Sequence, residues 1–318
     1  MDQLAGSGLR REDLTVRGGL GLVVQGGGMR GVFAMGALDG LARMGLTSTF
    51  DLCIGSSAGA ISLSYFLAGQ SNEVDESYWA AIKSSRTFKP TRVWRIIDVN
   101  RLVEDVIFGS LPLKVDALRN NPSRLLVGMT DADLRLPHYM VAQEADDDEL
   151  KALLRATSAL PGLSNSKVHI RGRRYLDGGF VDPLPINRLK MLGCDRLVVI
   201  TTNPLTYTIT NDSWGRRNAI KLLSVGQHRL VRQWIGTPNP LHDENLEALL
   251  WWSRDPERSK VLSIAPTDPL PDLTQDLDLL HRIFLSGREA AQRAIASVSW
   301  IPRPADQVPA ASNSTANG

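Results

Sequence analysis

The sequence predicts an α/β protein with a mostly parallel central sheet that is covered by helices on both faces. Short apolar runs alternate along the chain with longer segments of helical spacing, beginning with Leu20–Gln25 and Val32–Met44. Apolar runs of this length, bounded by glycines, are typical of buried strands. Their alternation with helices favours crossover connections, and crossover connections produce parallel strands.

The remaining elements follow from the same patterns. Further strands are expected at residues 50–54, 125–129, 138–143, 168–170, 197–201 and 261–265. Helices are expected at residues 32–44, 58–68, 147–157 and 185–192, with several more between 75 and 119. The segment 58–68 is apolar on almost every side, so we place its helix in the centre of the protein. The last third of the chain is expected to be mainly helical.

Composition and charge exclude several classes of function. The 36 basic and 34 acidic residues nearly cancel, which predicts no nucleic-acid partner. Cys53 and Cys194 lie in or beside apolar runs and predict two buried thiols, neither a disulfide framework nor a metal site. We recognise no signal peptide and no apolar run of the roughly 20 residues that span a bilayer. A cytoplasmic protein is therefore expected.

The first glycine cluster, Gly26–Gly31, follows the first expected strand and opens a helix. It fits the G-x-G-x-x-G pattern of dinucleotide-binding folds, which also requires an acidic residue at the end of the second strand. Asp51 precedes that strand, so the carboxylate is at the wrong end and the dinucleotide interpretation is disfavoured. Two interpretations stay open: a tight turn without a ligand, or a loop whose backbone N–H groups hold a developing anion.

A second motif, Gly55-Ser56-Ser57-Ala58-Gly59, fits the G-x-S-x-G pattern of a nucleophile elbow. Such an elbow lifts a serine hydroxyl out of a strand-to-helix turn, and glycines two residues away on each side relieve the crowding of the backbone. The alternative is a Gly/Ser-rich turn in which Ser56 or Ser57 caps the helix. The strand before the motif and the buried helix after it favour the elbow, with Ser57 as nucleophile.

A serine nucleophile needs a base. None of the five histidines, at positions 138, 169, 228, 242 and 281, lies in a distinctive setting. Asp177-Gly178-Gly179 instead closes an expected hairpin that begins at Val168. Taken alone, Asp-Gly favours an ordinary hairpin turn.

Together the three motifs resemble the patatin-like phospholipase family, bacterial branch. The resemblance rests on the order of G-G-G-x-R-G, G-x-S-x-G and D-G-G, and on the segments IGSSAGA, ATSALPG and DGGFVDPLPI. It implies a three-layer α/β/α fold with a helical C-terminal extension. The expected divisions are a catalytic domain at 20–205 and a mainly helical part at 206–300 packed on it. The Pro/Ala/Ser/Asn/Thr composition of residues 302–318 predicts a disordered tail.

The resemblance also implies the roles of particular residues. Ser57 attacks the acyl carbonyl of a lipid or other ester, and Asp177 accepts the proton in place of a histidine. The loop Gly26, Gly27, Gly28, Met29, Arg30 and Gly31 is the implied oxyanion hole, with the N–H groups of Gly27 and Gly28 as donors, Met29 as a further candidate and Arg30 as support. Gly55 and Gly59 shape the elbow, and Gly178 and Gly179 complete the D-G-G motif. No metal or cofactor is implied.

Three functions are weighed. Hydrolysis of lipid or phospholipid esters leads, acyl transfer through the same acyl-enzyme is the alternative, and dinucleotide binding is the least favoured. Peripheral membrane contact is considered at a basic amphipathic helix expected at Ser213–Ile235, although packing of its apolar side on the core is the favoured interpretation. The oligomeric state is left open.

Overall fold

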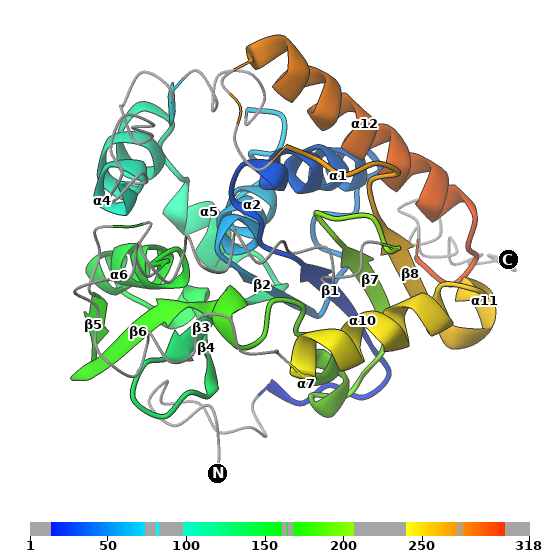
Figure 1. Cartoon of the computed structure of the whole chain (residues 1–318), viewed down its shortest axis with the longest axis horizontal. Coiled ribbons are helices and arrows are strands. Elements are labelled where there is room, and N and C mark those ends of the chain that lie inside the picture. Colours follow the sequence, from blue (N-terminus) through cyan, green and yellow to red (C-terminus); the bar gives the residue numbers. More distant parts are fainter. Residues whose placement is uncertain are drawn as a thin grey trace, which may run out of the picture.

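The computed structural model describes residues 14–73, 81–82, 98–160, 164, 168–206, 240–271, 274 and 276–302. Within these residues an eight-stranded sheet runs through the centre of the protein, with helices on both faces (Figure 1). Its strands are β1 (Gly19–Val24), β2 (Leu52–Ser56), β3 (Arg124–Asp131), β4 (Pro137–Val141), β5 (Val168–Ile170), β6 (Arg173–Asp177), β7 (Cys194–Ile200) and β8 (Val261–Ile264).

The helices connect and cover these strands. The α-helices are α1 (Gly31–Arg43), α2 (Ala58–Leu67), α4 (Val99–Arg101), α5 (Val115–Asn120), α6 (Asp147–Thr157), α7 (Ile186–Met191), α10 (Pro240–Trp252), α11 (Pro256–Ser259) and α12 (Leu277–Ala296). Shorter or differently wound segments are η2 (Gly28–Arg30), the π-helix η3 (Leu102–Ser110), η4 (Ala142–Glu144) and η5 (Gly178–Phe180).

The sheet is mostly parallel in its centre and antiparallel at one side. The strand order is β5-β6-β3-β2-β1-β7-β8, and β4 also pairs with β3. The pairs β1–β2, β2–β3, β1–β7 and β7–β8 are parallel, whereas β4, β5 and β6 are joined by antiparallel pairs. Helical crossovers therefore connect the central strands, as the alternating pattern of the sequence predicts.

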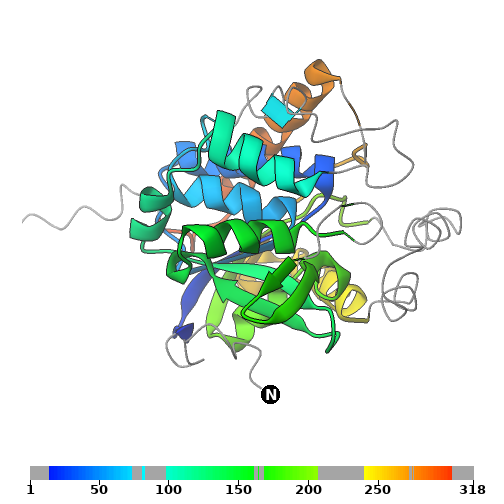
Figure 2. The ribbon, with the colours of Figure 1, turned by 90° about the vertical axis from the view of Figure 1, so that its left-hand side faces the viewer.

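Alternating side chains of the central strands bury against helices on the two faces. In β1, Leu20, Leu22 and Val24 belong to a larger core with α1, α2, α6 and α12, while Val23 faces a smaller core with α7 and Leu249 of α10. Figure 2 shows α2 (light blue) and α6 (green) lying across one face, with α10 (yellow) on the other side. The three-layer α/β/α prediction is confirmed, because strands that are apolar on both faces need a helical layer on each.

Most predicted elements lie within two residues of their observed bounds. The second strand was expected at residues 50–54, but β2 runs from Leu52 to Ser56, because Gly55 pairs with both β1 and β3 and Ser56 pairs with β3. The strand expected at 138–143 ends at Val141, where the short turn η4 begins. The expected helix at 213–235, much of 75–97 and the tail from 303 lie outside the described residues. In the described part, no helix is long and apolar enough to cross a bilayer.

The helices α1 and α12 are packed backbone against backbone (Figure 1). A Cβ atom at Gly36 would overlap the carbonyl oxygen of Phe284, and one at Gly287 would overlap the carbonyl oxygen of Phe33. An ion pair reinforces this contact, since the fully buried Asp39 accepts from the Arg288 guanidinium at 2.5 Å. The C-terminal helix is thereby fixed to the helix that follows the first glycine motif.

This contact predicts that Gly36→Ala destabilises the protein by about 3 kcal/mol, because the added methyl group forces two helix backbones apart. Equilibrium unfolding in urea measures the effect. Glu289→Ala, on the exposed side of α12, is the matched control and should change stability by less than about 0.5 kcal/mol. Equal stability of Gly36→Ala and the wild type would show that α1 and α12 separate without cost.

Candidate active site

Ser57 occupies the sharp turn between β2 and α2. Its backbone has φ 53° and ψ −132°, a conformation that a residue with a side chain adopts only at a cost of about 1–3 kcal/mol. Ser57 is the N-cap residue of α2, yet its side chain makes no capping hydrogen bond. The Ser57 side chain therefore does not cap the helix, although its backbone occupies the N-cap position, and the strained strand-to-helix turn matches the geometry expected of a nucleophile elbow.

The two glycines of the elbow are required by close packing. A Cβ at Gly55 would lie 2.9 Å from the backbone carbon of Gly59. A Cβ at Gly59 would overlap the carbonyl oxygen of Val24, at the end of β1. The spacing of the motif thus allows α2 to begin directly against the ends of β1 and β2.

Thr157, the last residue of α6, braces the elbow from the other side. Its fully buried hydroxyl accepts the Ser57 N–H at 2.8 Å and donates to the carbonyl oxygen of Gly128 at 2.6 Å. The Ser57 N–H is consequently occupied and does not face a substrate. Sequence analysis placed Thr157 in the ATSALPG segment but assigned it no role, because a single threonine at a helix end carries no distinctive signal.

Asp177 reaches the elbow through the pairing of β3. Gly128 of β3 pairs with Ser56, the last residue of β2, and the next residue, Met129, pairs with Asp177. Strand β4 pairs with Met129 from the other side of β3. Strands β2 and β6 therefore lie on the same side of β3, where they meet end to end. This arrangement brings Asp177 beside Ser57, although 120 positions separate them in the sequence.

The carboxyl group of Asp177 is buried and only partly satisfied. Its Oδ1 accepts the Gly179 N–H at 2.8 Å, whereas Oδ2 has no hydrogen-bond partner among the described residues. Burial raises the pKa of Asp177 to about 7, while the Gly179 N–H and the nearby Ser57 hydroxyl act in the opposite direction. A carboxyl group with a pKa near neutrality and a vacant oxygen can accept a proton from an adjacent hydroxyl.

The D-G-G segment is not the hairpin turn that its sequence alone favours. The turn between β5 and β6 lies at Arg171 and Gly172, both with positive φ, and Asp177 is the last residue of β6. A Cβ at Gly178 would overlap the carbonyl oxygen of Gly128 and approach the Cβ of Ser56 at 2.8 Å. Gly178 therefore permits the close approach of β6 to the elbow.

A buried polar group anchors the chain just after this segment. Asp182 donates its N–H to the carbonyl oxygen of Gly178 at 3.0 Å, and its side chain accepts the Tyr139 hydroxyl at 2.5 Å. Burial raises the pKa of Asp182 to about 6. Tyr139 and Asp182 connect β4 to the D-G-G turn, and sequence analysis identified neither as a functional residue.

The glycine loop 26–31 lies against the same elbow. A Cβ at Gly26 would approach the Ser57 Cβ at 3.0 Å, and a Cβ at Gly31 would approach the Ala58 Cβ at 2.7 Å. Gly28 has φ +56°, and a Cβ there would point into open space. The N–H groups of Gly27, Gly28 and Met29 have no acceptor among the described residues. Two helices, α1 and α2, also begin here, and helix N-termini favour negative charge.

Two side chains hold this loop to the end of β7. The side-chain oxygen of Gln25 accepts the Thr202 N–H at 2.9 Å, and the Thr202 hydroxyl donates to the carbonyl oxygen of Gly26 at 2.7 Å. A Cβ at Gly27 would lie 2.5 Å from that hydroxyl oxygen. Thr202 is a second buried threonine whose role only the structure reveals.

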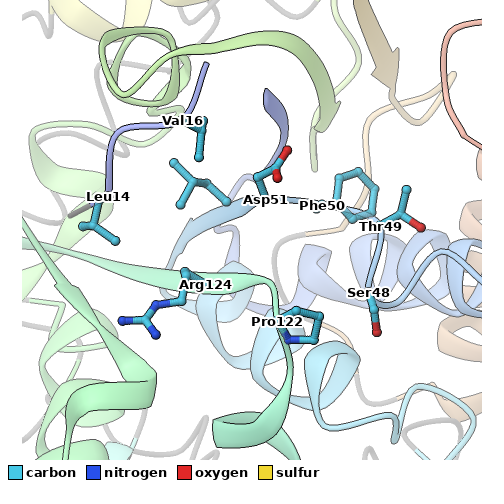
Figure 3. A pocket seen from close by; sticks show the side chains of 9 residues that line it. Leu14, Val16, Ser48, Thr49, Phe50, Asp51, Pro122 and Arg124 are labelled. Carbon is cyan, nitrogen blue, oxygen red and sulfur yellow. The ribbon is translucent and has the colours of Figure 1, made fainter. Parts of the chain in front are cut away.

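A separate pocket of about 260 Å³ lies at the opposite end of the central strands from Ser57 (Figure 3). It is lined by Asp51, Leu52 and Arg124, at the amino-terminal ends of β2 and β3. Asp51 accepts the Leu20 N–H at 2.7 Å and lies far from the glycine loop along the strands. The carboxylate that dinucleotide binding requires at the end of the second strand is therefore absent there within the described residues, because Asp51 precedes β2 and β2 ends at Ser56.

The cysteines and other metal-binding side chains offer no metal centre in the part of the chain that the structure describes. Cys53 and Cys194 are buried free thiols, as predicted. Burial raises the pKa of both thiols, that of Cys194 to about 12. Neither sulfur is therefore a reactive thiolate near neutral pH.

The comparison with known proteins gives the family. Residues 22–190 match the family model described as patatin-like phospholipase. The chain belongs to this family. Its patatin-like segment spans β1 to α7 and contains all three sequence motifs. Membership supports lipid hydrolase activity.

Two relatives and one solved structure are similar to this chain over different lengths. The Escherichia coli protein YjjU is 28% identical over 301 residues, which is 89% of this chain and 79% of YjjU. An NTE family protein of Mycobacterium bovis is 25% identical over 204 residues, 60% of this chain and 52% of that protein, so the chain spans about half of it. The crystal structure of VipD from Legionella pneumophila aligns at 13% identity with a TM-score of 0.44, over 89% of this chain and 68% of VipD.

The raised pKa of Asp177 predicts a pH-dependent gain in stability for Asp177→Asn. The pKa of this carboxyl group is near its usual 3.8 in the unfolded chain but about 7 in the folded protein, so stability is lost as pH rises through this window. Asparagine removes the penalty and keeps an oxygen for the Gly179 N–H. The melting temperature of the variant relative to wild type should therefore increase between about pH 4 and pH 8. A difference in melting temperature that stayed the same at every pH would contradict the raised pKa of Asp177.

Proposed function

We propose that this protein hydrolyses carboxylic ester bonds of lipids or phospholipids through a Ser57–Asp177 dyad and an acyl-enzyme intermediate. The observation that carries the proposal is the vacant, buried Oδ2 of Asp177 beside a serine held in a strained elbow. Family membership supports the lipid substrate. We assign the catalytic unit to residues 20–205, on which a mainly helical part, 206–300, packs.

Acylation begins with attack of the Ser57 Oγ on the acyl carbon of the ester. As the new C–O bond forms, the hydroxyl proton passes to the Asp177 carboxylate, and the carbonyl oxygen becomes an oxyanion. The tetrahedral intermediate then expels the alcohol, which takes the proton from Asp177. Water repeats the sequence on the acyl-enzyme: it loses a proton to Asp177, adds to the acyl carbon and releases the acid as Ser57 regains its proton.

The glycine loop is the proposed oxyanion hole. The N–H groups of Gly27, Gly28 and Met29 have no acceptor among the described residues, so they can donate to an oxygen at the elbow. Such donors are aligned before reaction and cost no reorganisation when charge develops, and each contributes about 10²–10³ in kcat. The N-terminus of α2 adds a field of the same sign. Gln25, Thr202 and Thr157 act indirectly, since they hold the loop and the elbow in register.

A fluorophosphonate probe tests the nucleophile directly, because it labels only an activated serine. The wild type should be labelled and should hydrolyse p-nitrophenyl esters, whereas Ser57→Ala should lose both properties and keep its fold. Asp177→Asn should lower kcat by about 10³-fold or more. Ser56→Ala is the matched control. The Ser56 hydroxyl is next to Ser57 in the sequence but is buried in β2, so its loss should leave labelling and hydrolysis unchanged. Labelling that persists in Ser57→Ala would refute the proposal.

The pH–rate profile follows from the state of Asp177. The carboxyl group must be ionised to accept a proton, and burial raises its pKa to about 7. The ratio kcat/KM should therefore rise with pH through a single ionisation near neutrality and then reach a plateau. An enzyme whose rate was already maximal near pH 5 would require a different base.

A further inference from the structure

A short turn projects from the same edge of the sheet as Ser57. The β3–β4 tip, residues 132–136, continues β3 past Met129, the residue that pairs with Asp177 (Figure 1). Since β2 and β3 are parallel, both strands end at this edge. The strand runs two residues beyond Met129 to Asp131, about 7 Å at the usual strand rise, before the tip begins, so the tip lies beyond the proposed dyad along the strand direction.

Two large apolar side chains of the β3–β4 tip are exposed. The side chain of Leu134 is 56% exposed and that of Leu136 is 42% exposed, although both belong to a chain whose other leucines are mostly buried. They are separated by one residue, Arg135, which is also exposed. Paired exposed leucines at one protruding turn are unfavourable in water and suit insertion into an apolar phase.

The turn is held in this conformation by its own hydrogen bonds. Asp131 Oδ1 accepts the N–H groups of Asp133 at 3.0 Å and Leu134 at 2.9 Å. The Arg135 N–H donates to the carbonyl oxygen of Asp131, and the Asp131 N–H donates to that of Leu136, both at 3.0 Å. The leucines are therefore presented before any partner arrives, and binding costs little conformational entropy.

Cationic side chains lie on and beside the β3–β4 tip. The β5–β6 turn lies beside the tip, because the Ala132 N–H donates to the carbonyl oxygen of Arg174 at 2.9 Å. Arg173 pairs with Asp131, but the arginine side chain is 51% exposed and the aspartate 5%. Arg171 likewise lies outside its partner Glu149. In these two pairs the carboxylate lies beneath the surface and the guanidinium group faces outward. The pair of Arg174 with Asp133 is the reverse, since the Asp133 side chain is the more exposed partner. The exposed arginines at 135, 171 and 173 outnumber this one carboxylate, so an approaching partner meets net positive charge.

We propose that the β3–β4 tip docks the protein on an anionic lipid surface. Leu134 and Leu136 insert among the acyl chains, while Arg135, Arg171 and Arg173 contact the head groups, in the manner of other interfacial segments. The Ser57 edge of the sheet then faces the bilayer. The purpose of docking rests on the proposed lipid hydrolysis, but the binding itself does not require turnover.

Vesicle co-sedimentation tests the docking surface. The protein carries Ser57→Ala, so that the vesicles stay intact, and the vesicles contain phosphatidylcholine alone or with an equal amount of phosphatidylglycerol. Binding should require the anionic lipid and weaken with added salt. Leu134→Ser with Leu136→Ser should weaken binding by about a hundredfold, at about tenfold for each leucine withdrawn from the apolar phase. Leu134→Phe should strengthen it.

Matched controls separate docking from folding and from catalysis. Met191→Ser and Trp251→Ser remove side chains that are 56% and 67% exposed on α7 and α10, and these variants should bind vesicles like the parent. With Ser57 intact, the double leucine variant should hydrolyse a water-soluble p-nitrophenyl ester at the wild-type rate but vesicle phospholipid far more slowly.

Three results would overturn the proposal. They are unchanged vesicle binding by the double leucine variant, weaker binding by Leu134→Phe, and sedimentation velocity that detects a wild-type dimer dissociated by the double variant. The last would make the tip an interface between two copies of the chain. Normal ester hydrolysis without vesicle binding refutes docking alone. Vesicle binding by a chain with no esterase activity refutes the proposed function alone.

Discussion

One edge of β3 determines the geometry of the whole site. Strands β2 and β6 occupy consecutive stretches of that edge, with Ser56 opposite Gly128 and Asp177 opposite Met129. Side chains alternate between faces along a strand, so a shift of one residue in the β3–β6 register would turn Asp177 to the other face of the sheet. Backbone pairing, more than any side-chain contact, places the carboxyl group beside the elbow. Gly128 and Gly178 allow the backbones to approach closely at the junction.

Opposing influences set the pKa of Asp177, the proposed base. Burial disfavours the ionised form of Asp177, whereas the Gly179 N–H and the Ser57 hydroxyl favour it. A fully hydrogen-bonded carboxylate would be a weaker base, and a carboxyl group without any donor would stay protonated at neutral pH. The Gly179 N–H on Oδ1, together with the nearby Ser57 hydroxyl, gives an intermediate state, which costs stability and leaves Asp177 able to take a proton from Ser57.

The sequence predicts the layered fold well because its central elements are periodic and long. The helices α1, α2 and α6 lie within a residue of their predicted bounds, since apolar spacing and glycine stops are local signals. The end of β2 at Ser56 is not a local signal, because pairing with the neighbouring strands, at Ser56 with β3 alone, extends β2 through a Gly-Ser pair. The three motifs could be found in the sequence, and the structure brings them together. Their catalytic roles remain predictions.

What the sequence could not indicate are the residues that act through long-range contacts. The Asp-Gly dipeptide locally favours a hairpin turn, and only its pairing with β3 excludes that interpretation. Thr157 and Thr202 are ordinary threonines in the sequence, each defined by partners more than 25 positions away. The exposed leucines of the β3–β4 tip are likewise indistinguishable from core leucines, because exposure is a property of the fold.

The hydrogen bonds of Thr157 to Ser57 and Gly128 make the length of α6 critical. This helix runs from its N-cap Asp146, whose side chain accepts the Glu149 N–H, to Thr157 at its last position. Each residue advances a helix by about 100°, so inserting or deleting a single residue within α6 would swing the hydroxyl away from both Ser57 and Gly128. Loop-length variation among relatives should consequently collect in connections outside this helix.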